Sequence, residues 1–81
     1  MAKHKAYNGH KNWNHWNVSL WIGNDYGLYN LALDHIKGHV RNLDGAARAM
    51  LGDLESLDMP KTPDGAEYSF TTIRAALSGL T

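Results

Sequence analysis

Two histidines in the middle of the sequence have a spacing that suits a metal ion. His35 and His39 are four residues apart, and on a helix side chains at this spacing share one face, where two imidazoles can bind one transition metal. Such a metal needs a third ligand, but Asp34 falls on a neighbouring face, and no glutamate stands between the histidines as in a metalloprotease helix. The sequence favours two solvated histidines near a helix C-terminus and predicts no metal site.

Residues that could catalyse a reaction lack the surroundings that catalysis requires. No serine lies in a nucleophile motif, and the glycines are scattered rather than gathered into a phosphate-binding loop. Asp53 and Glu55 are two residues apart, so on a helix they do not face one another as paired acid–base groups do. We therefore predict that the protein is not an enzyme and that it has no cofactor.

Charge is balanced overall but unevenly distributed along the chain. The formal net charge is zero, which argues against non-specific nucleic-acid binding through bulk charge, yet no carboxylate precedes Asp25. The second half is rich in acidic residues, which form either a solvated rim or a partner-binding surface. The predicted partner-binding residues are Asp53, Glu55, Asp58, Asp64 and Glu67. The alternative binding residues are basic or titratable and lie near the start: Lys3, Lys5, Lys11 and His15.

Helical periodicity sets the organisation of the chain. Residues 1–11 have little to bury, so we expect a flexible basic N-terminal arm, followed by a single helical domain over residues 12–81. Four apolar stripes at helical spacing and no convincing strand alternation predict an all-α fold, a compact bundle of about four short helices. The only segment where a strand could hide is 68–73.

Capping residues predict where these helices begin and end. Asn14 is expected to cap the first helix, which ends at Gly23-Asn24 through a left-handed residue. Asp25 caps a second helix over about 26–40, and Asn42 or Asp44 starts a third that runs to about residue 57. A loop with two prolines covers 58–65, and a short final helix follows it.

Large apolar side chains on these stripes are the predicted core, since a domain of 81 residues without cysteines depends on dense packing. The predicted core residues are Trp13, Trp16, Leu20, Trp21, Tyr29, Leu33, Ile36, Met50, Leu54, Phe70, Ile73 and Leu77. In the alternative interpretation, one tryptophan ring stays exposed as a binding hot spot. Asn17 disfavours the interior of a helix, so we expect it to be partly buried and bonded to another segment.

The segment from Asn12 to Tyr29 carries a resemblance to known proteins. It reads Asn-Trp-Asn-His-Trp-Asn-Val-Ser-Leu-Trp-Ile-Gly-Asn-Asp, followed by Gly27-Leu28-Tyr29. This resembles a family of small, mostly uncharacterised proteins of phages and mobile elements, in which an aromatic residue precedes Thr-Trp-Asn-Val-x-Leu-Trp-Ile and then Asn-Asp. The chain departs from that pattern by carrying His15 in place of threonine and Tyr26 in place of an acidic residue. In length and composition it is also similar to small anti-CRISPR proteins that act on type I-C systems.

The resemblance implies a phage-derived inhibitor that binds a type I CRISPR surveillance complex (Cascade) and blocks target DNA binding through a protein–protein interface. The partner would be a subunit of that complex, and the protein itself a monomer or weak homodimer. The alternative is a small nucleic-acid-binding accessory protein with aromatic stacking platforms. No apolar run approaches the roughly 20 residues that span a bilayer, and no secretory signal is recognisable, so we expect no membrane contact and a cytoplasmic location.

Overall fold

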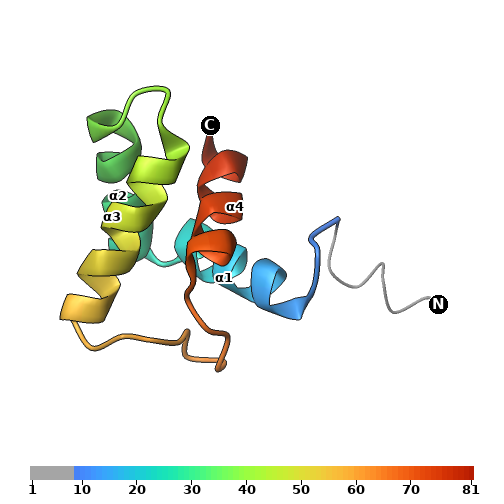
Figure 1. Ribbon diagram of the computed structural model, residues 1–81. Helices are drawn as coiled ribbons and strands as arrows, with labels where there is room; N and C mark the ends of the chain where they lie inside the picture. Colours follow the sequence, from blue (N-terminus) through green and yellow to red (C-terminus); the bar gives the residue numbers. More distant parts are fainter. Residues whose placement is uncertain (1–8) are drawn as a thin grey trace.

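Four helices make up the structure, a computed structural model that describes residues 9–81 (Figure 1). They are α1 (Trp13–Asn24), α2 (Tyr26–Gly38), α3 (Leu43–Ser56) and α4 (Phe70–Leu80). Within the described residues there is no strand, only one isolated antiparallel bridge between Lys61 and Glu67. The predicted all-α bundle is therefore confirmed, whereas most of the predicted arm, including Lys3 and Lys5, lies outside the described residues.

Side-chain caps start every helix, although one is not the predicted residue. Asp25 caps α2 as expected, and of the two candidates for α3 the cap is Asn42 rather than Asp44; the two caps accept hydrogen bonds from Leu28 N and Gly45 N at 3.0 Å each. The cap of α1 is Asn12 rather than Asn14, so the prediction for that helix was wrong by two residues. The wrong choice has a simple reason: both are asparagines, and only backbone geometry decides between them.

The junction between α1 and α2 also differs from the prediction. Asn24 remains helical, and the next residue, Asp25, has an extended backbone with a φ of -87°, so no left-handed residue ends α1. The backbone amide of Asp25 donates to Trp21 O at 2.9 Å while its carboxylate caps α2. One residue thus closes the first helix and opens the second. A left-handed residue occurs instead after α2, at Arg41 with a φ of 60°.

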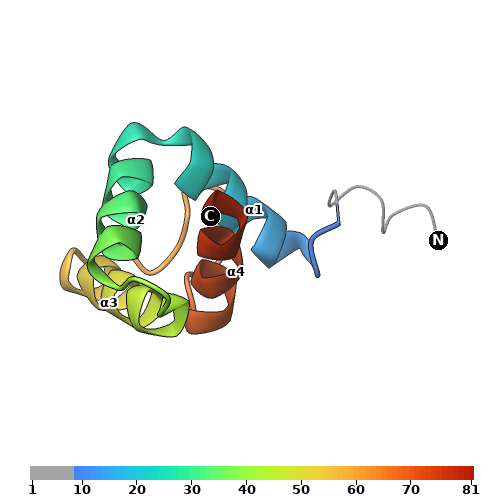
Figure 2. The same ribbon diagram turned by 90° about the horizontal axis from the view of Figure 1, so that it is seen from above.

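Each helix packs mainly against two others, so the four main contacts form a closed ring. α1 packs against α4 and α2, and α3 packs against α2 and α4. Figure 1 shows α3 and α4 side by side with opposite chain directions, and Figure 2 shows from above how α1 passes beside α4. The connection of residues 57–69, referred to below as the long loop, runs from the end of α3 to the start of α4 along one end of the bundle (Figure 1).

The core is made of residues from all four helices and the long loop. Of the predicted core residues, Met50, Leu54, Ile73 and Leu77 are fully buried. Four others are half-buried against them or beside the core, namely Trp16, Trp21, Leu33 and Ile36, and Phe70 also packs on it. The predicted core residues did not include several buried residues with smaller or flanking side chains, some of which lie on or beside the predicted stripes: Val18, Ile22, Leu28, Ala32, Ala46, Ala47, Ala66, Tyr68 and Ala76.

Three residues predicted for the core are exposed instead. Trp13, Leu20 and Tyr29 keep 37%, 38% and 37% of their surface in solvent, so placing them in the core was wrong. On α1 the reason is rotational: the helix buries Asn17, Val18 and Ile22, and this face lies away from the one that carries Trp13 and Leu20. The bundle therefore leaves an apolar side of α1 uncovered.

Candidate binding surfaces

A polar network fastens the long loop to α1. Asn17 is 1% exposed, and its side-chain oxygen accepts a hydrogen bond from Thr62 Oγ1 at 2.6 Å while its amide nitrogen donates to Asp64 Oδ2 at 2.9 Å. The indole of Trp21 donates to the same carboxylate oxygen at 2.9 Å. The prediction that Asn17 is buried and bonds to another segment is confirmed, and these bonds fix where the loop lies.

The same contacts give Asp64 an internal role. Hydrogen bonds from Asn17 and then from Trp21 lower the pKa of Asp64 below its ordinary value, because both donors stabilise the charged carboxylate. Within the loop, Gly65 has a left-handed φ of 97°, and its amide donates to Thr62 O at 2.9 Å, which forms a tight turn around Asp64. Asp64 therefore belongs to the internal framework of the loop.

Asp53 is likewise engaged within the molecule. Its Oδ2 lies 2.6 Å from Nε2 of His35 on α2, across the α2–α3 contact. His39 Nδ1 in turn lies 2.8 Å from the carbonyl oxygen of His35. Both histidines of the potential metal pair thus have other partners, and among residues 9–81 no group of three or more metal-ligating side chains is brought together.

The remaining acidic residues lie at the end of α3 and on the long loop. Glu55, Asp58 and Glu67 are exposed, and within residues 9–81 their side chains make no hydrogen bond to the rest of the protein. Asp58 also has a left-handed backbone with a φ of 57°. Of the five predicted partner-binding residues, Asp53 and Asp64 therefore bond within the protein. The other three carboxylates have no internal hydrogen bond among the described residues and are exposed.

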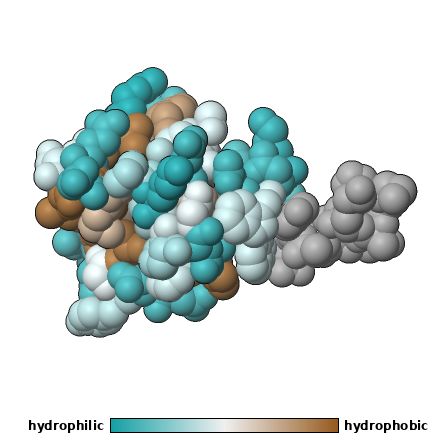
Figure 3. All heavy atoms as spheres, turned by 90° about the horizontal axis from the view of Figure 1, so that it is seen from below, coloured by the Kyte–Doolittle hydropathy of each residue, from teal (hydrophilic) through white to brown (hydrophobic). Residues whose placement is uncertain are grey.

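An apolar groove accompanies these free carboxylates. It has a volume of about 340 Å³ and lies between α2 and the end of α3, where it is lined by Leu28, Leu31, Leu54, Leu57, Met59, Asp25 and Gly27. Leu57 is 62% exposed and Met59 39%, both adjoining Asp58 in the chain. Figure 3 views this end of the bundle and shows hydrophobic patches interrupted by hydrophilic side chains. We call Glu55, Leu57, Asp58 and Met59 the α3-end surface.

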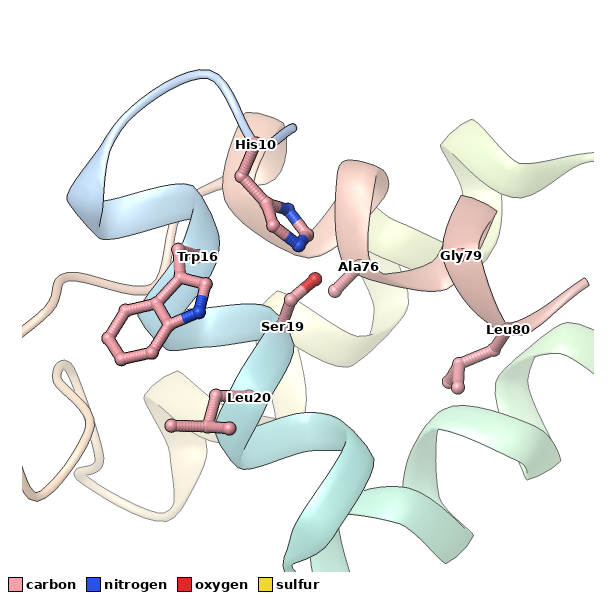
Figure 4. Close-up of a pocket in the computed structure, with 7 residues that line it drawn as sticks. All are labelled: His10, Trp16, Ser19, Leu20, Ala76, Gly79 and Leu80. Carbon is pink, nitrogen blue, oxygen red and sulfur yellow. The ribbon is translucent and has the colours of Figure 1, made fainter. Parts of the chain in front are cut away.

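A second concave site lies between α1 and α4. It has a volume of about 320 Å³ and is lined by His10, Trp16, Ser19, Leu20, Ala76, Gly79 and Leu80. Figure 4 shows the imidazole of His10 and the hydroxyl of Ser19 pointing toward the same space, with the indole of Trp16 at one side and Leu80 at the other. We call this site the α1–α4 pocket. Neither Asp nor Glu lines it.

Positive and titratable groups gather around the start of α1. The pKa of His15 is lowered, first by burial and then by the charges of Lys11 and His10, so His15 is less readily protonated than an ordinary histidine and Lys11 carries the positive charge here. The first turn of α1 contains no acidic residue. Of the predicted alternative binding residues, Lys11 and His15 lie around the start of α1, and Lys11 directly follows His10, which lines the α1–α4 pocket.

Neither the apolar groove between α2 and α3 nor the α1–α4 pocket was predicted from the sequence. The pocket joins the first and last helices, and the groove joins the start of α2 to the end of α3, so no local motif marks either site. The one available signal was an excess of apolar residues on α1 and at 57–59, more than one buried stripe can hold.

Comparison with known proteins adds a family but no activity. No curated protein and no solved structure matches the chain. No described helix is long and apolar enough to cross a membrane. Residues 3–78 match a family described as a family of unknown function (DUF7249). Since the match extends over nearly the whole sequence, the chain belongs to this family of unknown function.

Proposed function

We propose that the protein is a non-catalytic inhibitor that binds a type I CRISPR surveillance complex in the bacterial cytoplasm and prevents target DNA from binding. The resemblance of residues 12–29 and of the overall composition to small anti-CRISPR proteins supports the kind of partner. The observation that carries the proposal is the α3-end surface, where exposed Leu57 and Met59 adjoin the free carboxylates of Glu55 and Asp58.

The chemistry of this surface suits a basic protein groove. A channel that holds nucleic acid by positive charge and backbone geometry also attracts an acidic protein surface, which then competes with DNA. Charge alone gives steering more than affinity, whereas a desolvated apolar centre with a polar rim is the usual arrangement of an energetic hot spot. Leu57 and Met59 supply the apolar centre, and Glu55 and Asp58 supply the rim.

Only the exposed carboxylates, Glu55 and Asp58 of the α3-end surface and Glu67 of the long loop, can take part in the proposed mechanism. Asp53 and Asp64 have partners on α2 and α1, so replacing either would disturb the fold as well as the surface. Asp58 has a left-handed backbone that asparagine and aspartate tolerate better than lysine does. Glu55, which is exposed on α3 and free of side-chain hydrogen bonds within residues 9–81, is therefore the most informative position for charge reversal.

The experiment titrates the purified protein against a type I surveillance complex and measures the binding of a labelled target duplex. One protein per complex is expected to abolish DNA binding. Leu57→Ala should weaken inhibition about tenfold or more, as expected for a residue of an interface centre. Glu55→Lys should have an effect of about the same size, because a lysine in the rim is repelled by a basic partner. Asp34→Lys makes the same charge change on an exposed residue of α2 and should inhibit like the unaltered protein.

Two results would separate the function from the surface. Full inhibition by Glu55→Lys and Leu57→Ala shows that the complex is bound through another part of the protein. A protein that neither binds the surveillance complex nor reduces its DNA binding at micromolar concentrations, across several type I subtypes, contradicts the proposed function itself.

A further inference from the structure

The α1–α4 pocket combines aromatic, apolar and hydrogen-bonding groups in a small space. Trp16 and His10 contribute ring systems, Leu20 and Leu80 aliphatic walls, and Ser19 a hydroxyl that can donate or accept a hydrogen bond (Figure 4). Its volume of about 320 Å³ is at the lower end of ligand pockets, which span roughly 300–1,000 Å³. A flat heteroaromatic ring with polar edges fits this combination better than an aliphatic or a strongly charged group does.

The surroundings of the pocket favour a ligand that also carries negative charge. Lys11 is exposed and directly follows His10, which lines the pocket, so one positive charge is attached to the pocket's edge through the backbone. No Asp or Glu belongs to the lining. A nucleotide base linked to phosphates offers an aromatic ring for the pocket and negative charges for Lys11 beside it.

We propose that the α1–α4 pocket takes an unstacked base of a single-stranded nucleic acid, with Trp16 as its stacking surface and with Lys11 on the phosphate backbone. A base paired in a duplex does not expose its face, so the pocket would select single strands. The proposal is independent of the proposed inhibitor function, because that function uses the α3-end surface and shares no residue with this pocket.

Gly79 allows the pocket to be closed without disturbing the fold. It lines the pocket from the last turn of α4, and a Cβ built there meets no atom within 4 Å. Gly79→Leu therefore adds a bulky side chain to a residue of the pocket wall without a clash, and also raises helix propensity. Gly52 on α3 has equally open surroundings and lies outside the pocket, so Gly52→Leu is the matched control.

The test measures fluorescence anisotropy of labelled oligo(dT) and oligo(rU) of about 12 nucleotides, within the usual site sizes of single-strand binders. A duplex of the same length serves as comparison, at roughly 50 mM salt, where phosphate contacts are strong. Both single strands should bind the unaltered protein at least about tenfold more tightly than the duplex, with quenching of tryptophan emission. A preference for one strand type identifies the source as DNA or RNA.

The variants decide whether the pocket is responsible. Gly79→Leu and Trp16→Ala should each weaken single-strand binding about tenfold or more, the loss expected for one stacked base. Gly52→Leu and Tyr26→Ala, the latter removing an aromatic ring that is 83% exposed on α2, should bind normally. Circular dichroism melts establish that each variant is folded, and Gly79→Leu remains decisive if Trp16→Ala melts early.

Three results would overturn the proposal. One is the absence of single-strand binding at about 100 µM protein and low salt, where even weak non-specific complexes form. The second is equal affinity for duplex and single strands. The third is unchanged binding by Gly79→Leu and Trp16→Ala, which would place any nucleic-acid contact elsewhere on the surface. Capture of a protein partner that Gly79→Leu abolishes, without any oligonucleotide binding, would assign the pocket to a protein side chain instead.

Discussion

Replacing Asn17 by alanine tests how strongly the long loop is fastened to α1. The substitution removes the acceptor of the Thr62 hydroxyl, which lies 2.6 Å from Asn17 Oδ1 and belongs to a residue that is only 4% exposed. A buried donor that loses its acceptor costs about 1–3 kcal/mol, while alanine regains roughly 0.5 kcal/mol through its higher helix propensity. We therefore expect a loss of about 2 kcal/mol in the free energy of unfolding.

Thermal unfolding followed by circular dichroism measures this loss. For a domain of this size 1 kcal/mol corresponds to about 4–8 °C, so the melting temperature should fall by roughly 8–16 °C. Amide hydrogen exchange should also accelerate at Gly65 and Ala66, whose backbone amides donate to Thr62 O and Thr62 Oγ1.

Asn14→Ala is the matched control for this experiment. Asn14 lies on the same helix, is exposed, and makes no side-chain hydrogen bond within the described residues, so its replacement should change stability by less than about 0.5 kcal/mol. Equal melting temperatures for Asn14→Ala and Asn17→Ala would refute the reasoning. So would strict additivity of Asn17→Ala and Thr62→Val, since residues that share a hydrogen bond should show a coupling of about 0.5 kcal/mol or more.

Three further predictions concern single side chains. The bonds from Asn17 and Trp21 lower the pKa of Asp64, so the contribution of this carboxylate to stability is present above the unfolded pKa near 3.8 and disappears as pH falls through the lower folded value. Asp64→Asn should therefore make the melting temperature depend less on pH between about pH 2 and 5. Tyr68→Phe should leave stability unchanged or raise it by up to about 1 kcal/mol, because the buried Tyr68 hydroxyl has no hydrogen-bond partner in the described structure; a clear loss in a denaturant melt contradicts this. Ser69→Ala should cost about 1 kcal/mol in the same melt, since Ser69 caps α4 in a reciprocal pair with Thr72, and Ser78→Ala, exposed near the other end of the helix, should not.

Local rules were sufficient to predict most of the helices. Asp25 was identified as a cap, and Asn42 as one of two candidates, because an acceptor side chain before an apolar stripe satisfies free amides wherever the rest of the chain lies. The α3 stripe through Met50 and Leu54 was also correct, since its opposite side is polar and only one rotation buries the apolar face.

The orientation of α1 could not be obtained in the same way. Apolar residues lie on several of its sides, so periodicity alone does not select the buried one, and the tryptophans were assigned to the core for their size. Asn17 was the better guide, because a buried amide must find partners and these are supplied by Thr62 and Asp64, more than 40 residues away. The buried face of α1 is therefore set by a long-range polar contact.

The acidic residues also show that spacing along the sequence does not predict long-range contacts. Proximity in sequence suggested one continuous rim, but Asp53 is turned toward His35 on α2 and Asp64 toward α1. Neither partner is within ten residues of its carboxylate along the chain, so neither pairing was predictable from spacing. Only Glu55, Asp58 and Glu67 have no internal side-chain hydrogen bond within residues 9–81, so for these three the predicted partner-binding role stays a prediction.

Although the formal net charge is zero, exposed residues of opposite charge lie at two separate places on the protein. Lys11 and His15 lie at the start of α1, and Glu55 and Asp58 at the end of α3; Figures 1 and 2 both place these two ends on opposite sides of the bundle. Local charge, rather than the total, orients an approaching ligand within a Debye length of about 8–10 Å. Each charged surface also adjoins exposed apolar side chains, Trp13 and Leu20 at one and Leu57 and Met59 at the other. We therefore expect a basic partner to approach the end of α3 and an anionic one the start of α1, and because the two proposed sites share no residue, a substitution that weakens one should leave the other intact.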